Sequence, residues 1–347
     1  MTLQLVCLRI DEAPPDVQVS ADRGVAMIDP RELQRHAPDL HLLALDTASD
    51  PKGLLRARCS CWWTETPAMD GERVGTIGHY AAGAADADAE AGAWLIEHAC
   101  RRLRDAGCTL AIAPMDGNTW RRYRFIIERG EEPPFFLEPD QPDVWPDHFV
   151  ASGFSELATY TSALTTDLAQ ADPRLQSAAA RLASRGVTVR ALDLTPARAE
   201  ADLRRIYALS RVSFSGNYLY TPIDEAEFID QYRSVLPVVQ PELVLLAERR
   251  SEPASELVGF LFAVPDLLQR RRTGSTDTII IKTVAVAPGA ASAGLGSLLV
   301  GQVQKQAAAL GYRRAIHALM HERNVSQNIS RRYARTIRRY AIFSRAL

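Results

Sequence analysis

Cysteine is scarce in this chain and confined to its first third. The five residues are Cys7, Cys59, Cys61, Cys100 and Cys108. Their odd number and the absence of a C-x-x-C pair argue against a disulfide framework or a zinc site. We therefore expect buried free thiols, no bound metal, and no thiol nucleophile in the second half of the chain.

The chain also lacks an apolar run near ~20 residues, and its first residues lack the basic and apolar regions of a secretion signal. Neither sign of charge dominates, because 40 Lys and Arg residues face 42 Asp and Glu residues. These absences predict a cytoplasmic protein that spans no membrane and has no nucleic-acid partner. The remaining composition, 47% apolar and 24% charged over 347 residues, is typical of a soluble protein with two domains.

The most informative stretch runs from Asp277 to Tyr312. It opens with the β-branched sequence TIIIKTVAVA, which is typical of a buried strand and which Pro288 and Gly289 end. A loop of small residues follows and leads directly into a helical pattern that Gly311 ends. Such a loop leaves backbone N–H groups free at the positive end of the helix dipole, an arrangement suited to phosphate.

The spacing of this stretch resembles motif A of the GNAT acetyltransferase superfamily. In that family a strand ending in Val-x-Pro precedes a loop of the form Arg/Gln-x-x-Gly-x-Gly/Ala, and the loop binds the pyrophosphate of acetyl-CoA. Here Val286 with Pro288, and Gly294 with Gly296, stand at the family's distances. Ala291 stands where the family has Arg or Gln, so the main-chain amides remain but a side-chain donor is missing.

The resemblance implies acetyl-CoA as co-substrate and a set of residues that bind it. A main-chain N–H near Val284 to Val286 would meet the acyl oxygen, where charge develops during transfer. The implied cofactor-binding residues are Val284, Ala285, Val286, Ala291, Ser292, Ala293, Gly294, Leu295, Gly296, Ser297 and Asn324.

The resemblance also implies a proton donor for the leaving thiolate, often a Tyr in the helix after the next strand. Tyr333 is the candidate here, with Asn324 or Ser326 as the polar residue of that motif. The alternative for Tyr333 is an aromatic ring packed between helix and sheet.

The general base that would deprotonate an amine is less determined. His317 lies in the strand after the phosphate-loop helix, where a histidine can equally be a core residue. Glu225 and Glu227 lie in the segment that covers the acceptor in this family, and water can also perform the task.

The acceptor would meet residues 217–222 of the same segment. Asn217, Tyr218 and Tyr220 are the predicted substrate-binding residues, and the tyrosines favour a partly apolar acceptor. Residues 116–123 are dense in polar and aromatic groups, and they either contribute to this site or form a packed connection.

Two series of predicted elements match at an offset of 204 residues. Residues 105–108 correspond to residues 309–312, because each stretch ends a helix and opens a strand. We therefore predict an α/β (α+β) architecture with the GNAT fold duplicated, each copy a mixed, mostly antiparallel sheet with helices on both faces. The predicted parts are a first domain over residues 1–168, a linker helix within 169–186, and a second domain over 187–347.

The two copies differ at the predicted phosphate loop. In the first copy Asp86, Asp88 and Glu90 occupy it, and two like charges ~5 Å apart at an effective dielectric of ~20 repel by about 3 kcal/mol. The alternative is that these acids stabilise the start of a helix through its dipole. We predict that residues 1–168 are a degenerate, non-binding domain and that residues 187–347 are catalytic.

The end of the chain is basic, with seven arginines against Glu322 between residues 322 and 347. A helix over Ser326 to Thr336 and a strand within Tyr340 to Ala346 are predicted there. Part of the charge is expected to meet the phosphates of CoA and the rest to lie on a solvated helix face.

Together these features predict an N-acetyltransferase that moves acetyl from acetyl-CoA directly to a primary amine of a small molecule or peptide. One alternative is an acyltransferase with another donor or acceptor, as in mycothiol synthase, which also resembles two fused GNAT domains. The other is a CoA-binding regulator or scaffold without activity.

Overall fold

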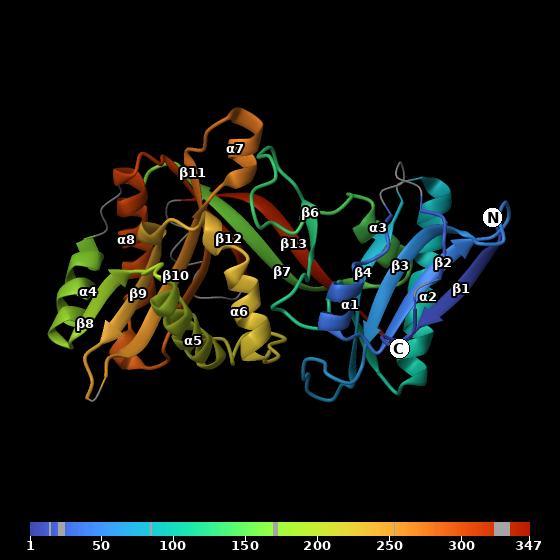
Figure 1. Cartoon of the computed structure of the whole chain (residues 1–347), viewed down its shortest axis with the longest axis horizontal. Coiled ribbons are helices and arrows are strands. Elements are labelled where there is room, and N and C mark those ends of the chain that lie inside the picture. The colour runs from blue at the N-terminus through green and yellow to red at the C-terminus, as the bar shows by residue number, and fades with distance from the viewer. Residues whose placement is uncertain (14, 20–24, 84, 169–172, 253, 323–333) are drawn as a thin grey trace.

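The structure is a computed structural model that describes residues 1–13, 15–19, 25–83, 85–168, 173–252, 254–322 and 334–347 (Figure 1). All five cysteines are free thiols, and four of them are buried, as the sequence predicts. No helix among the described residues is long and apolar enough to cross a membrane.

The first half of the chain forms strands backed by one long helix. Its elements are β1 (Leu3–Leu8), α1 (Pro30–His36), β2 (Leu40–Asp46), β3 (Leu54–Trp62), β4 (Val74–Ala82), α2 (Asp86–Asp105), β5 (Leu110–Ala113), β6 (Phe125–Glu128), α3 (Trp145–Ala151) and β7 (Ser155–Thr165). Helix α1 begins at Pro30, because proline suits the first position of a helix and the Asp29 side chain accepts a hydrogen bond from the Arg31 N–H.

The second half repeats this layout. Its elements are α4 (Pro173–Ser184), β8 (Val187–Ala191), α5 (Pro196–Ser213), α6 (Glu225–Arg233), the 3-10 turns η2 (Leu236–Val238) and η3 (Pro241–Leu243), β9 (Val244–Arg249), β10 (Glu256–Pro265), α7 (Leu267–Thr273), β11 (Thr278–Val286), the turn η4 (Ala290–Ser292), α8 (Leu295–Ala309), β12 (Arg314–His321) and β13 (Arg335–Ala346). The predicted linker helix is α4, and it packs against α8 and β8.

Asp86, Asp88 and Glu90 lie in the first turns of α2 and not in a phosphate loop. This agrees with the alternative interpretation, in which the dipole of the helix favours acids at its start. One sequence prediction about a helix end is wrong. The helix predicted to reach Thr336 does not, because β13 begins at Arg335 and pairs with strands on both sides. The rest of that predicted helix lies outside the described residues.

The strands form one continuous sheet in which the two halves exchange their last strands. The order is β1-β2-β3-β4-β5-β13-β7-β12-β11-β10-β9-β8, and β6 also pairs with β13. Strand β7 of the first half lies against β12 of the second, with Thr165 opposite Ala315, and β13 lies against β5, with Phe343 opposite Ala113 (Figure 1). The sheet therefore does not divide at residue 168 or 187, where the sequence predicts separate domains.

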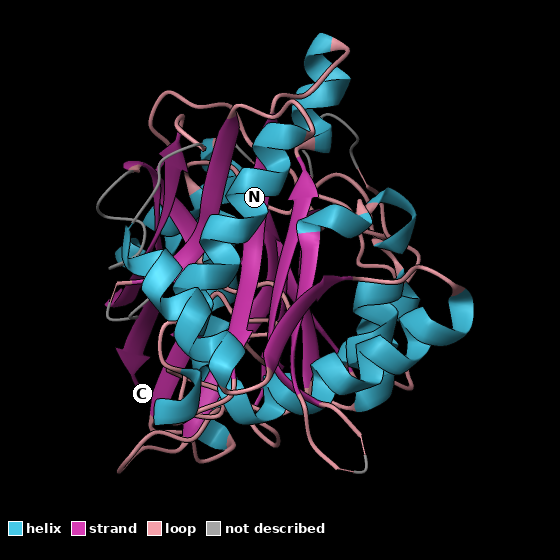
Figure 2. Cartoon of the chain, turned by 90° about the vertical axis from the view of Figure 1, so that its left-hand side faces the viewer, coloured by secondary structure: helices cyan, strands magenta, loops and turns pink. Residues whose placement is uncertain are grey.

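Helices cover both faces of the sheet (Figure 2). Successive side chains of strand β9 point to opposite faces of the sheet and meet different helices. Leu245 packs in one core cluster with Leu299 of α8, and Leu246 packs in another with Phe228 of α6. The predicted mixed, mostly antiparallel sheet with helices on both faces is confirmed, and it is present in both halves of the chain.

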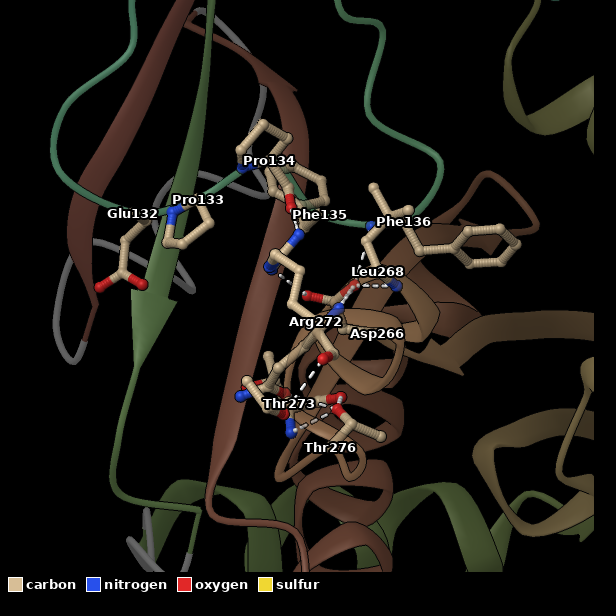
Figure 3. A network of polar contacts seen from close by, with 12 residues as sticks. Glu132, Pro133, Pro134, Phe135, Phe136, Asp266, Leu268, Arg272, Thr273 and Thr276 are labelled. Atoms are coloured by element: carbon tan, nitrogen blue, oxygen red, sulfur yellow. Dashed lines mark hydrogen bonds and ion pairs between the residues drawn. The ribbon is translucent and has the colours of Figure 1, made fainter.

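Residues 132–138 of the first half are held against the second half beside α7 (Figure 3). The Asp266 carboxylate, at the start of α7, accepts hydrogen bonds from the backbone N–H of Leu268 at 3.0 Å and of Phe136 at 3.0 Å. The Arg272 guanidinium donates to the Pro134 carbonyl at 2.8 Å. These contacts fix a loop of the first half at the edge of a cavity that both halves line.

Candidate active site

A cavity of about 1900 Å³ lies where the two halves meet. Strands β11 and β12, helix α6 and residues between 213 and 220 line it from the second half. Residues 119–124, 137–140 and 156–160 line it from the first half. The site is therefore shared between the halves, although the sequence assigns it mainly to the second.

The parting of two parallel strands opens this cavity. Strand β11 pairs with β12 from Thr278 to Ile281, opposite Arg314 to His317, and the pairing ends there. Beyond that point Val284 and Val286 of β11 line the cavity, as does Gly296 at the start of α8. The phosphate loop predicted from the sequence thus borders the cavity.

The start of α8 fits an anion. Gly294 precedes the helix with a φ of 85°, in the left-handed region that favours glycine, and no side chain caps this end within the described part of the chain. Of the other predicted cofactor-binding residues, Ala285 and Leu295 are core residues and Ser292 is buried, so they can offer main-chain groups only. Ala291, Ala293 and Ser297 belong to the loop and to the first turn of α8.

Two arginines from outside the loop lie against it. Arg181 of α4 donates to the Ala293 carbonyl at 2.9 Å, and Arg185 donates to the Ala291 carbonyl at 3.3 Å. Both side chains are exposed. They bring positive charge to the corner where Ala291 leaves the family's Arg or Gln position without a donor.

The predicted acceptor segment lines the cavity through Asn217, Tyr218 and Tyr220. Trp120 of the first half packs edge-on against Tyr220, and its indole N–H donates to the Thr221 carbonyl at 2.8 Å. Residues 119–123 therefore form both a wall of the cavity and a packed connection between the halves.

His317 lines the cavity but is 7% exposed. Its Nε2 lies 3.1 Å from Gln304 Nε2, and burial lowers the pKa of the imidazole to about 4. The ring is therefore neutral at pH 7, and its assignment as general base stays a prediction.

Glu227 does not have the geometry of the predicted base. Its two carboxylate oxygens accept hydrogen bonds from Arg121 of the first half at 2.7 and 2.9 Å, and it is not among the residues that line the cavity. This ion pair between the halves engages both carboxylate oxygens and favours the ionised form of Glu227, away from the cavity. Tyr333 and Asn324 lie outside the described residues.

Lys282 is a cavity residue that sequence reasoning missed. It stands at a bulge of β11, where the pairing with β10 shifts, and its Nζ donates to the Leu137 carbonyl at 2.8 Å. Burial, and then the Arg124 guanidinium, lower the pKa of this amine to about 7. A lone lysine within the apolar strand TIIIKTVAV was the available signal.

The matching corner of the first half is filled by its own side chains. Asp88, which is 1% exposed, forms an ion pair with Arg56 at 3.1 Å. The His79 N–H, at the equivalent place on β4, donates to the buried Asp116 carboxylate at 2.6 Å. A Cβ at Gly78 would come within 2.3 Å of the Met115 carbonyl oxygen, so the gap between β4 and β5 is closed there.

The basic end of the chain does not reach the phosphate loop where the structure describes it. Arg338 is buried and forms an ion pair with Glu138 at 2.8 Å. Three further arginines pair with carboxylates of the first half: Arg335 with Glu132, Arg339 with Glu128 and Arg345 with Glu97. The described part of this charge holds the exchanged strand in place. Arg323, Arg331 and Arg332 lie outside the described residues, so the meeting of part of this charge with CoA phosphates stays a prediction.

With this geometry in view, residues 203–335 match the model of the Acetyltransferase (GNAT) family. The second half of the chain therefore contains a region similar to the GNAT acetyltransferases. No curated protein matches the chain in sequence.

Solved structures share the fold over most of the chain. A probable N-acyltransferase from Enterococcus faecalis has 10% identity and a TM-score of 0.53, over 100% of this chain and 73% of that one. A GCN5-related N-acetyltransferase from Kribbella flavida has 13% identity and a TM-score of 0.51, over 100% of this chain and 71% of that one.

The third is a GCN5-related glucosamine N-acetyltransferase region of a fungal multi-domain β-N-acetylglucosaminidase. It has 13% identity and a TM-score of 0.52 over 88% of this chain. This chain spans 33% of the fungal protein. At these identities the likeness establishes the fold.

Proposed function

We propose that this protein is an acetyl-CoA-dependent N-acetyltransferase that transfers acetyl directly to a primary amine, with its working site in the second half. The observation that carries the proposal is the uncapped start of α8 beside the parted strands β11 and β12, both open to one cavity. Bound acetyl-CoA would supply the acyl group as a thioester.

The residues of this chain divide the work between binding and transfer. The N–H groups at residues 294–297, with Arg181 and Arg185, would hold the diphosphate. The Val286 N–H already donates to Ser213 Oγ at 3.2 Å, so we assign the acyl oxygen to backbone nearer the bulge, at Val284. His317 or a water molecule would take the proton of the amine, and Tyr333 would return one to the thiolate.

Measuring CoA binding and thiol release together tests the proposal. We expect one CoA per chain by calorimetry, and free thiol from acetyl-CoA with at least one member of an amine panel. Gly296→Leu should abolish binding, because the nearest atoms to a Cβ there are Val286 Cγ2 at 3.7 Å and Val284 Cγ1 at 3.8 Å, so the new side chain enters the cavity without a backbone clash. Ala308→Leu, at an exposed position of α8, is the matched control.

The outcomes separate the alternatives. Two CoA equivalents per chain would contradict the assignment to the second half. If CoA binds but no amine causes release of free thiol from acetyl-CoA, the protein is better described as a CoA-binding regulator. Thiol release only with another acyl-CoA or a thiol acceptor would favour an acyltransferase with a different donor or acceptor.

A further inference from the structure

Two cations from different halves of the chain line the same cavity. Lys282 comes from the bulge of β11, and Arg124 precedes β6. Arg124 is 6% exposed, and its guanidinium carbon lies 3.7 Å from the centre of the Tyr123 ring and 4.1 Å from that of Tyr160. Both positive charges are therefore held inside the molecule and beside the proposed acceptor site.

The hydrogen-bond partners of these cations are carbonyl groups. Arg124 donates from Nη1 to the Leu319 carbonyl at 3.2 Å and from Nε to the Tyr123 carbonyl at 3.1 Å. Lys282 donates to the Leu137 carbonyl at 2.8 Å. Among the residues that the structure describes, no carboxylate forms an ion pair with either cation.

The one buried carboxylate near them is already neutralised. Glu138 receives Arg338 Nε at 2.8 Å and the Tyr340 hydroxyl at 2.6 Å. The other carboxylates of the lining stand at exposed positions, where water screens them: Asp140, Glu156, Asp230 and Glu322. The remaining charged and histidine residues of the lining are Arg121, which forms an ion pair with Glu227, the exposed Arg35 and Arg122, the partly buried His321 and the buried His317.

The interior of the cavity thus carries an excess of positive charge. Burying a cation without an anion is unfavourable, and the cavity can relieve this by binding one. The lowered pKa of Lys282 reflects the same imbalance, since burial and Arg124 both oppose its protonation and Glu138 offsets them only in part.

We propose that the acceptor amine also carries an anionic group, a carboxylate in the first instance, which Lys282 and Arg124 bind together. Lys282 and Val284 are two residues apart on one strand, so their backbones lie ~7 Å apart at a rise of ~3.3 Å per residue. An anion at Lys282 and an amine at the acyl carbon therefore belong to one small molecule, an amino acid or a similar compound. Naming this ligand as the acceptor rests on the proposed function, but the anion site itself does not.

Paired substrates test the inference in the presence of acetyl-CoA. The panel is tyrosine with tyramine, histidine with histamine, and lysine with 1,5-diaminopentane, and phosphoethanolamine tests phosphate against carboxylate. We expect the acid of at least one pair to have a kcat/KM roughly tenfold or more above that of its decarboxylated partner, the effect of a charge-assisted hydrogen bond. Lys282→Met should remove this preference, and Lys305→Met, an exposed lysine on α8, should keep it.

A binding measurement without acetyl-CoA separates this inference from the proposed function. Calorimetry of the preferred acid, or of acetate, in two buffers of different ionisation enthalpy at pH 7 should show proton uptake by the wild type and none by Lys282→Met. Uptake without any acetyl transfer would sustain the anion site and overturn the proposed function. Acetylation of both members of every pair with equal kcat/KM, unchanged in Lys282→Met, would overturn the anion site alone, and a preference for phosphoethanolamine over every acid would replace carboxylate by phosphate.

Discussion

At the scale of single residues, the corner that begins α8 depends on side chains from another helix. Arg181 and Arg185 donate to carbonyls of residues 293 and 291, so their guanidinium groups lie beside the N–H groups of the loop. A cation at this place adds to the field of the helix N-terminus, which already favours an anion. The missing donor at Ala291 is thus replaced from outside the motif.

We predict that Arg181→Ala raises the Kd for CoA by roughly tenfold, the loss of one charge-assisted contact, and makes binding less sensitive to salt. Adding Ala291→Arg to this variant should restore much of the affinity. Arg198→Ala, at an exposed site on α5, is the control, and calorimetry at two salt concentrations is the measurement. Unchanged affinity in Arg181→Ala would show that the amides alone hold the diphosphate.

A second residue-scale feature is a chain of histidines in the first half. His41 Nδ1 lies 2.7 Å from Ser60 Oγ, which lies 3.0 Å from His79 Nδ1, and His79 Nε2 lies 2.8 Å from His36 Nδ1. Burial is the main reason that the pKa of His41 and of His79 falls to about 3 and that of His36 to about 4. The three rings are therefore neutral in the folded protein at pH 7.

We predict that the free energy of unfolding decreases as the pH falls below ~6.5, the ordinary pKa of histidine. The unfolded chain then takes up protons that the folded chain refuses, at about 1.4 kcal/mol per pH unit for each such histidine. Urea titrations between pH ~6.5 and ~5, above the ordinary pKa range of carboxyl groups, measure the slope. His79→Gln should have a shallower slope, and an equal slope in that variant would contradict the assignment.

Two of these histidines, His36 and His79, lie close to Glu32, and the three side chains place potential metal-ligand atoms within 4.8 Å of one another. Arg58 and Arg121 both lower the pKa of His79, which shows that positive charge already surrounds these rings. The absence of a bound metal stays a prediction from the sequence. An unchanged melting temperature of the protein after addition of zinc would agree with it.

At the scale of elements, the exchanged strand β13 is anchored by a buried ion pair. The side chains of Arg338 and Glu138 are 1% and 0% exposed, and the pair links β13 to a loop of the first half. Tyr340 of the same strand donates to Glu138 at 2.6 Å. Arg338 and Glu138 each need the other as counter-ion, because neither side chain can reach water.

We predict that Glu138→Gln destabilises the protein by ~3–5 kcal/mol, because it leaves the Arg338 charge buried without a counter-ion. The double variant Glu138→Gln with Arg338→Met should cost less than the sum of the two single changes. Urea denaturation measures all three. Arg339→Met, whose ion pair with Glu128 is partly exposed, is the control and should change stability by less than ~1 kcal/mol.

At the scale of the whole molecule, the two halves share one sheet and one cavity. Strand β7 separates β13 from β12, so removal of either half leaves a gap in the sheet of the other. Exposed strand edges and the apolar surface behind them would then face water. The two copies of the fold are therefore one folding unit in this chain.

We predict that residues 1–168 and 187–347 do not fold when expressed apart, and that the whole chain unfolds in a single transition. Circular dichroism and calorimetry of the fragments and of the whole chain make the test. Expression of both fragments in one cell should recover a complex if α4 is supplied with the second. A folded, CoA-binding fragment of residues 187–347 would show that the exchange is dispensable.

The sequence by itself determined the strand Thr278–Val286, the helix after it and the glycine loop between them, because β-branched runs, helical periodicity and glycine act on the local backbone. It also determined that the fold occurs twice. Only the tertiary structure decided the exchange of β7 and β13, the burial of Arg338 against Glu138, and the placement of Lys282 and Arg124 in one cavity. Each of these depends on which distant segments become neighbours, and local propensity is the same whichever partner a strand or a charge finally meets.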